Sequence, residues 1–69
     1  MARILLGVRG MDTRVAAERV ERTLIAVNGV RSVDANVDGQ ATVEYDDADV
    51  TVMDLIRSLR QIGFLAGME

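Results

Sequence analysis

The sequence lacks cysteine, histidine, proline and tryptophan altogether, and its 69 residues include only two aromatic side chains, Tyr45 and Phe64. Without cysteine there is no disulfide, no thiolate metal ligand and no thiol nucleophile. Without histidine there is no imidazole ligand and no side chain that titrates unperturbed near neutral pH. With so few aromatic rings the core must be aliphatic, and a stacking platform for single-stranded nucleic acid is excluded.

Charge and hydropathy exclude further classes of protein. The sequence contains eight arginines and eleven acidic residues, and the resulting net charge of −3 argues against binding to nucleic acid. No apolar run approaches the roughly 18 residues that cross a membrane, and the start of the chain lacks the pattern of a signal peptide. We therefore expect a cytoplasmic protein without membrane insertion. At this length we expect a single domain over residues 1–69.

Hydrophobic periodicity predicts a strand and then a helix in the first 29 residues. Residues 3–9 alternate as in a strand with one buried face, formed by Ile4, Leu6 and Val8. From residue 14 the spacing becomes helical, with one apolar stripe formed by Ala17, Val20, Leu24 and Val27. Asn28-Gly29 supplies the left-handed residue that commonly follows a helix, so we expect the helix to end there.

A second unit of the same kind follows. Residues 30–37 predict a strand, Asp38-Gly39 predicts a two-residue hairpin turn, and residues 41–45 predict the return strand. Thr51 and Asp54 have the spacing of a capping box at the start of a second helix that stops at Gly63. The apolar stripe of that helix consists of Val52, Leu55, Ile56, Leu59 and Ile62. Residues 64–68 predict a short closing strand.

The predicted βαββαβ order indicates an α+β fold, the ferredoxin-like sandwich, in which two helices cover one face of a four-stranded antiparallel sheet. Short motifs in register support this. Residues 6–11 fit the pattern LxVxGM, residues 20–24 fit VExxL, residues 29–33 fit GVxSV and residues 63–66 fit GFxA. In these motifs the chain resembles the heavy-metal-associated (HMA) domain family, which includes copper chaperones and the N-terminal metal-binding domains of heavy-metal P-type ATPases.

The chain departs from the family at the metal-binding motif. The family motif is GMxCxxC, whereas residues 10–16 read GMDTRVA, so Thr13 and Ala16 stand at the two cysteine positions. The resemblance implies that those thiolates bind Cu(I) or another soft ion, which neither a hydroxyl nor a methyl group replaces. We therefore expect no metal ion and no cofactor. Residues 10–16, which include Met11, Asp12, Thr13 and Ala16, are called the vestigial loop below.

Each candidate ligand also has a structural interpretation. The resemblance places Met11 in the core, where Met commonly fills gaps, although its thioether is a soft ligand. Asp12 and Thr13 stand where a helix begins and are expected to cap it, because two oxygen ligands fall short of the roughly six that Ca²⁺ or Mg²⁺ requires. An acidic run is expected to be a solvated turn, with a hard-cation site as the alternative: Glu44, Asp46, Asp47 and Asp49.

The sequence shows no paired carboxylates, no Ser–His arrangement and no phosphate-binding glycine loop, so we expect no enzymatic activity. The favoured hypothesis is a degenerate HMA domain that acts as a protein-interaction or regulatory module linked to metal homeostasis, with Arg9, Asp12, Arg14 and Phe64 on its docking surface. The resemblance implies a heavy-metal P-type ATPase or a related HMA domain as partner, and a monomer or weak homodimer. The alternatives are a metal carrier that uses Met11 and Asp12, and a regulatory dimer that binds a small ligand.

Overall fold

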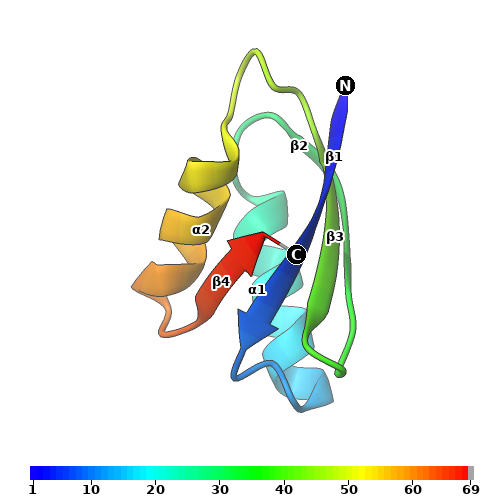
Figure 1. Ribbon diagram of the computed structural model, residues 1–69, viewed down its shortest axis with the longest axis vertical. Coiled ribbons are helices and arrows are strands. Elements are labelled where there is room, and N and C mark those ends of the chain that lie inside the picture. Colours follow the sequence, from blue (N-terminus) through cyan, green and yellow to red (C-terminus); the bar gives the residue numbers. More distant parts are fainter. Residues whose placement is uncertain (69) are drawn as a thin grey trace.

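A computed structural model describes residues 1–68 and contains four strands and two helices. In chain order they are β1 (Ala2–Arg9), α1 (Arg14–Ile25), β2 (Val30–Ala35), β3 (Gln40–Tyr45), α2 (Val52–Gln61) and β4 (Leu65–Met68). The sheet has the order β2-β3-β1-β4, and every neighbouring pair is antiparallel. Both helices cover the same face of the sheet (Figure 1). The predicted ferredoxin-like fold is confirmed.

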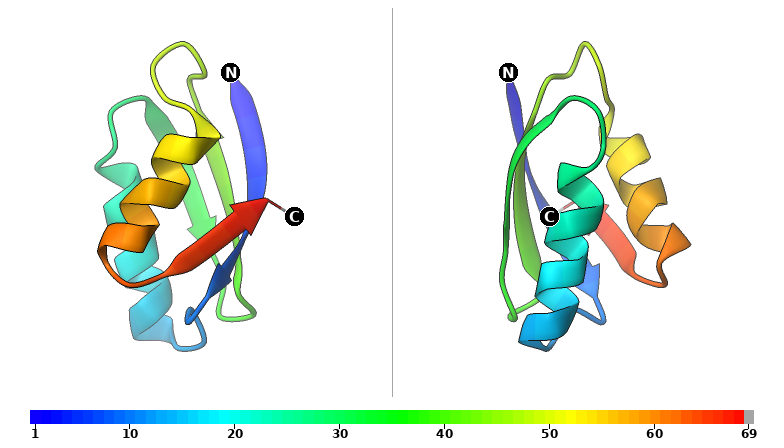
Figure 2. Two further views of the ribbon diagram at one scale, coloured as in Figure 1. Left: turned by 60° about the vertical axis from the view of Figure 1, so that its left-hand side comes forward. Right: turned by 180° about the vertical axis from the view of Figure 1, so that it is seen from behind.

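The core lies between the helices and one face of the sheet. Leu6 of β1 is paired with Ala41 of β3, and both side chains are fully buried. The helices contribute further fully buried residues to the same core: Val20, Leu24, Leu55 and Leu59. α1 packs over β2 and α2 over β4, so the two helices lie on different halves of the sheet (Figure 2). Each large aliphatic side chain buried in this way stabilises the fold by about 1.5–3 kcal/mol.

The capping box predicted at the start of α2 is confirmed. The Thr51 backbone N–H donates to Asp54 Oδ2 at 3.0 Å, and the Asp54 backbone N–H donates to Thr51 Oγ1 at 3.2 Å. These hydrogen bonds satisfy two N–H groups at the helix start that have no partner within the helix. The bond from the Thr51 backbone, with smaller effects from its side chain and from Arg57, holds the pKa of Asp54 below its ordinary value.

The predicted end of the first helix is wrong. α1 ends at Ile25, and the following residues form tight turns in which Val27 N–H donates to Leu24 O and Val30 N–H donates to Val27 O. Gly29 follows the helix at a distance and has a φ of +99°. A Cβ there would lie 2.8 Å from the Cβ of Asp49, so this position requires glycine for space as well as for its dihedral angle.

The predicted two-residue hairpin turn is also wrong, because β2 ends at Ala35 and residues 36–39 connect it to β3. Gly39 N–H donates to Asn36 O at 3.1 Å, and Asn36 N–H donates to Gln40 O at 2.9 Å. Gly39 has a φ of +94°, as in a three-residue hairpin closed by a bulge. Val37 therefore lies in the turn, 54% exposed, and not on the buried face of a strand.

Candidate functional site

The vestigial loop lies at one end of the molecule, between β1 and α1. The β2–β3 turn (residues 36–39) and the α2–β4 turn (residues 62–64) lie at the same end (Figure 1). We call this the loop end. Gly10 begins the loop with a φ of +94°, and a Cβ on Gly10 would lie 3.4 Å from Cδ1 of the Phe64 ring. The loop therefore turns sharply out of β1 directly against the residue that precedes β4.

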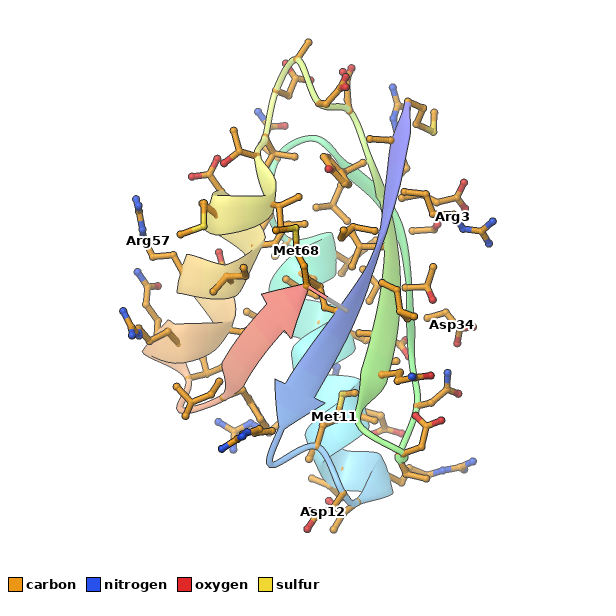
Figure 3. All side chains as sticks on the ribbon, in the orientation of Figure 1. Arg3, Met11, Asp12, Asp34, Arg57 and Met68 are labelled. Carbon is orange, nitrogen blue, oxygen red and sulfur yellow. The ribbon has the colours of Figure 1, made fainter. Side chains whose placement is uncertain are left out.

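Met11 is part of the hydrophobic core. Its side chain points from the loop into the interior, between β1 and α1 (Figure 3), and only 1% of it is exposed. It belongs to the same cluster of buried residues as Phe64. A thioether held in this position packs against apolar groups and is directed away from solvent, where an incoming ion would arrive.

Thr13 caps α1. Its backbone is extended, with φ −129° and ψ 161°, and its Oγ1 accepts a hydrogen bond from the Ala16 backbone N–H at 3.1 Å. The Thr13 carbonyl accepts the next bond, from Ala17 N–H at 3.0 Å. The predicted capping role is confirmed for Thr13. Asp12 lies exposed at the tip of the loop (Figure 3), and the helix carries no acidic residue in its first turn.

The structure places three of the four residues predicted for the docking surface in solvent. Arg9 ends β1, Arg14 begins α1, and Asp12 lies between them on the loop; all three are exposed. Phe64 is only 8% exposed, so its ring contributes mainly to packing under the loop. Their position within one short stretch of chain brings two positive charges and one negative charge to the loop end.

Val15 belongs to the same surface but was missed in the sequence. It follows Arg14 in the first turn of α1 and is 68% exposed. A signal for it was available, because Val15 does not fall on the stripe that begins at Ala17 and continues through Val20. An apolar residue off the buried stripe of a helix faces water in the isolated domain.

The acidic run lies at the other end of the molecule, near the connection from β3 to α2. Asp46 Oδ1 accepts a hydrogen bond from Ala48 N–H at 3.0 Å, and the Asp46 carbonyl accepts from Asp49 and Val50. Asp46, the first residue of the turn, therefore accepts the hydrogen bonds that close it. Within residues 1–68 the acidic side chains form no group of three that could hold a metal ion.

The remaining methionines lie far apart in the sequence. Met1 precedes β1, Met53 lies in the first turn of α2 and Met68 ends β4. All three are largely exposed, whereas Met11 is buried at the loop end (Figure 3).

Within residues 1–68 neither helix has the length and apolarity that a membrane crossing requires.

Comparison with known proteins places this geometry in a family. The heavy-metal-associated domain family matches residues 6–64, which include the second half of β1, the vestigial loop, both helices, β2 and β3, and the turn that leads into β4. The chain belongs to the heavy-metal-associated domain family. Among curated proteins, the copper chaperone CopZ of Staphylococcus aureus is 34% identical over 65 residues, which cover 93% of this chain and 96% of that protein.

Solved structures show the same relationship. A copper-binding domain from HMA7, a P-type ATPase, superposes with a TM-score of 0.96 at 30% identity, covering 100% of this chain and 95% of that one. Oxidised MerP from Ralstonia metallidurans CH34 superposes with a TM-score of 0.93 at 28% identity, covering 99% and 96%. This HMA domain is thus related to metal chaperones and to the metal-binding domains of ATPases.

The donor atoms distinguish this HMA domain from the pattern of its family. Thr13 and Ala16 occupy the positions of the two cysteines in GMxCxxC, and the 69 residues contain no cysteine elsewhere. Soft ions such as Cu(I) select thiolate and thioether ligands over hydroxyl oxygen. The Thr13 hydroxyl is already bonded to the helix start, and Ala16 offers only a methyl group. The residues present do not fit a soft metal ion.

Proposed function

We propose that this HMA domain holds no thiolate-bound metal ion and acts instead by docking on a protein partner through its loop end. One observation carries the proposal: a helix cap between Thr13 and Ala16 stands where the family motif has a pair of thiolates, inside a loop whose Met11 is buried in the core. Met11 and Phe64 both belong to the buried core. A surface kept in shape without its metal ligands remains able to recognise a protein.

The chemistry of the loop end favours a partner with an acidic surface. Arg9 and Arg14 are exposed and carry permanent positive charge, and guanidinium groups bind carboxylates through paired hydrogen bonds. Val15, 68% exposed, adds an apolar contact beside them. A related HMA domain or the cytoplasmic part of a heavy-metal P-type ATPase is the partner that the relatives favour, since a copper chaperone and an ATPase domain are both among them.

On this proposal the domain is a cytoplasmic binding module without catalytic activity. Its contribution to metal homeostasis is regulatory, because it can occupy a docking surface of a transport protein without delivering an ion. The alternative of a metal carrier based on Met11 and Asp12 is disfavoured, since Met11 is buried and Asp12 is a single exposed carboxylate. A hard cation requires about six oxygen ligands.

The docking proposal is tested by NMR titration of the isotope-labelled chain with a cysteine-containing HMA domain of a P-type ATPase from the same cell. Shift changes are expected at the loop end, and reversal of both charges in Arg9→Glu/Arg14→Glu should weaken binding about tenfold or more. Arg57→Glu is the control, because Arg57 is also exposed but lies on the outer side of α2 (Figure 3). Equal weakening by the control, or unchanged binding in the double variant, contradicts the proposal.

A further inference from the structure

A groove runs between α1 and the edge strand β2, and one of its ends reaches the loop end at Arg14, Asn36 and Val37. It consists of two adjoining hollows of about 170 Å³ and about 350 Å³ that share Glu18 and Glu21 on their walls. The first hollow is lined further by Arg22, Ile25 and Val33, and the second by Arg14, Ala17, Ala35, Asn36 and Val37. We call this the α1–β2 groove.

One wall of the groove is the backbone of an unpaired sheet edge. β2 has β3 on one side and no strand on the other within the described residues. In an antiparallel ladder, residues that bond to the neighbouring strand alternate with residues whose N–H and C=O groups face away from it. The Asn36 N–H donates to the carbonyl of Gln40, the first residue of β3, so Asn36 faces β3. By the alternation, the backbone N–H and C=O groups of Val33 and Ala35 face the free edge.

The other wall carries charges of both signs in alternation. Arg14, Glu18 and Arg22 follow one another at intervals of one helical turn, and all three are exposed. Beyond Arg22, Ile25 is 50% exposed and offers an apolar contact. A surface with both signs in sequence is not suited to a partner of uniformly acidic or uniformly basic character, because half of its charges would then face like charges.

We propose that the α1–β2 groove binds a second copy of this chain, with the two β2 strands paired antiparallel about a two-fold axis. Such pairing makes one continuous sheet from both copies and sets the two α1 helices side by side in opposite directions. A two-fold axis that passes between Glu18 and Arg22 brings each of these residues opposite the other on the second copy, so opposite charges meet across the interface. Arg22 of each copy then faces Glu18 and Glu21 of the other.

The structure also indicates that this association is weak. The β2–β3 ladder shifts register between Val30 and Ser32, and such a bulge disturbs the start of the edge. Regular edge backbone is therefore confined to the part of β2 around Val33 and Ala35. Asp34 adds a carboxylate from each copy on the open face of the sheet, where its side chain points away from the helices (Figure 3). An interface this short lies at the lower end of the size range for specific complexes.

The test is the mass of the chain in solution, measured by light scattering from about 10 µM to about 1 mM, the range in which weak complexes form. The 7.5 kDa chain should rise toward twice its mass with concentration. Arg22→Glu alone and Glu18→Arg/Glu21→Arg alone should each remain monomeric at 1 mM, because like charges then meet across the two-fold. An equimolar mixture of these two variants should recover the dimer.

Arg57→Glu, which changes the same kind of charge on the outer side of α2, should leave dimerisation unchanged. A wild-type chain that stays monomeric throughout contradicts the inference, and so does a mixture of the complementary variants that fails to associate. Loss of dimer in the Arg57 control contradicts it as well. None of the substituted residues lies on the loop end and the measurement contains no partner protein, so its outcome is distinguishable from that of the docking test.

Discussion

The Oγ1 of Thr13 accepts a hydrogen bond from the backbone N–H of Ala16, 3.1 Å away. These two residues stand at the cysteine positions of the family motif, so a bond that stabilises the start of α1 lies where that motif has a pair of thiolates. In the same loop Gly10 turns the chain with a φ of +94° and Met11 is buried. The chain has the fold of the family without the two cysteines of its motif.

Thr13→Ala is expected to lower the free energy of unfolding by about 1 kcal/mol, the usual loss when an N-cap hydroxyl is removed. Thr13→Ser is the matched control and should retain most of the stability, because its hydroxyl can accept the same bond from Ala16 N–H. Chemical denaturation followed by circular dichroism measures both. Equal stability of the alanine and serine variants would show that the cap contributes nothing.

Met11→Leu conserves volume and should cost less than about 1.5 kcal/mol, whereas Met11→Ala should cost about 2–5 kcal/mol because it leaves a cavity in the core. Metal affinity of the purified chain, measured by competition with a chelator, should be the same for wild type and Met11→Leu. A metal ion held by wild type and lost specifically in Met11→Leu would identify the thioether as a ligand and favour the carrier alternative.

Gly29→Ala should destabilise the fold more than Gly63→Ala. Both glycines have positive φ, at +99° and +91°, so both substitutions meet the strain of roughly 1–2 kcal/mol that this region imposes on other residues. Only at Gly29 does the new methyl group also collide, 2.8 Å from Asp49 Cβ; at Gly63 nothing lies within 4 Å. Thermal unfolding of the two variants compares them directly, and equal loss would contradict the close approach at Gly29.

The capping box makes the free energy of unfolding depend on pH. Because the hydrogen bonds from Thr51 hold the pKa of Asp54 below its ordinary value, the folded state binds this proton less readily than the unfolded chain. The contribution is therefore complete above the unfolded carboxyl pKa of about 3.9, and is lost as the pH falls through the lower folded value. Asp54→Asn should be less stable than wild type at neutral pH, with a difference that shrinks below pH 4. A difference independent of pH would contradict this origin.

Much of the fold could be predicted from the sequence because its signals are local and periodic. The stripe through Leu55 and Leu59 and the Thr51–Asp54 capping box were sufficient to locate α2. The wrong helix end involves a longer-range contact, whereas the wrong hairpin turn was misjudged in its local geometry. Gly29 does not end the helix; it lies where the chain passes close to Asp49. The hairpin turn begins at Asn36, earlier than the Asp38-Gly39 pair alone indicates.

The role of individual residues of the candidate site could be predicted from the sequence, but the set of residues exposed on its surface was predicted only in part. Thr13 could be identified as a helix cap from its type and place, and the structure shows the bond. Phe64 was predicted on the docking surface but is only 8% exposed, and Val15, which lies off the buried stripe of α1, was not assigned to that surface although its position carried the signal. The alternation of charge along the α1–β2 groove acquires meaning only once α1 is known to lie beside an unpaired strand.

The central claim is that the scaffold of the metal site persists without its ligands, and Cu(I) titration against a competing chelator tests it most directly. Wild type should bind no stoichiometric Cu(I) at micromolar affinity, whereas Thr13→Cys/Ala16→Cys should bind one ion tightly, because thiolates then return to an intact loop. Thr13→Ser/Ala16→Ser, which adds oxygen in place of sulfur, should behave as wild type. Stoichiometric Cu(I) binding by wild type, or a folded double-cysteine variant that binds none, would contradict the account.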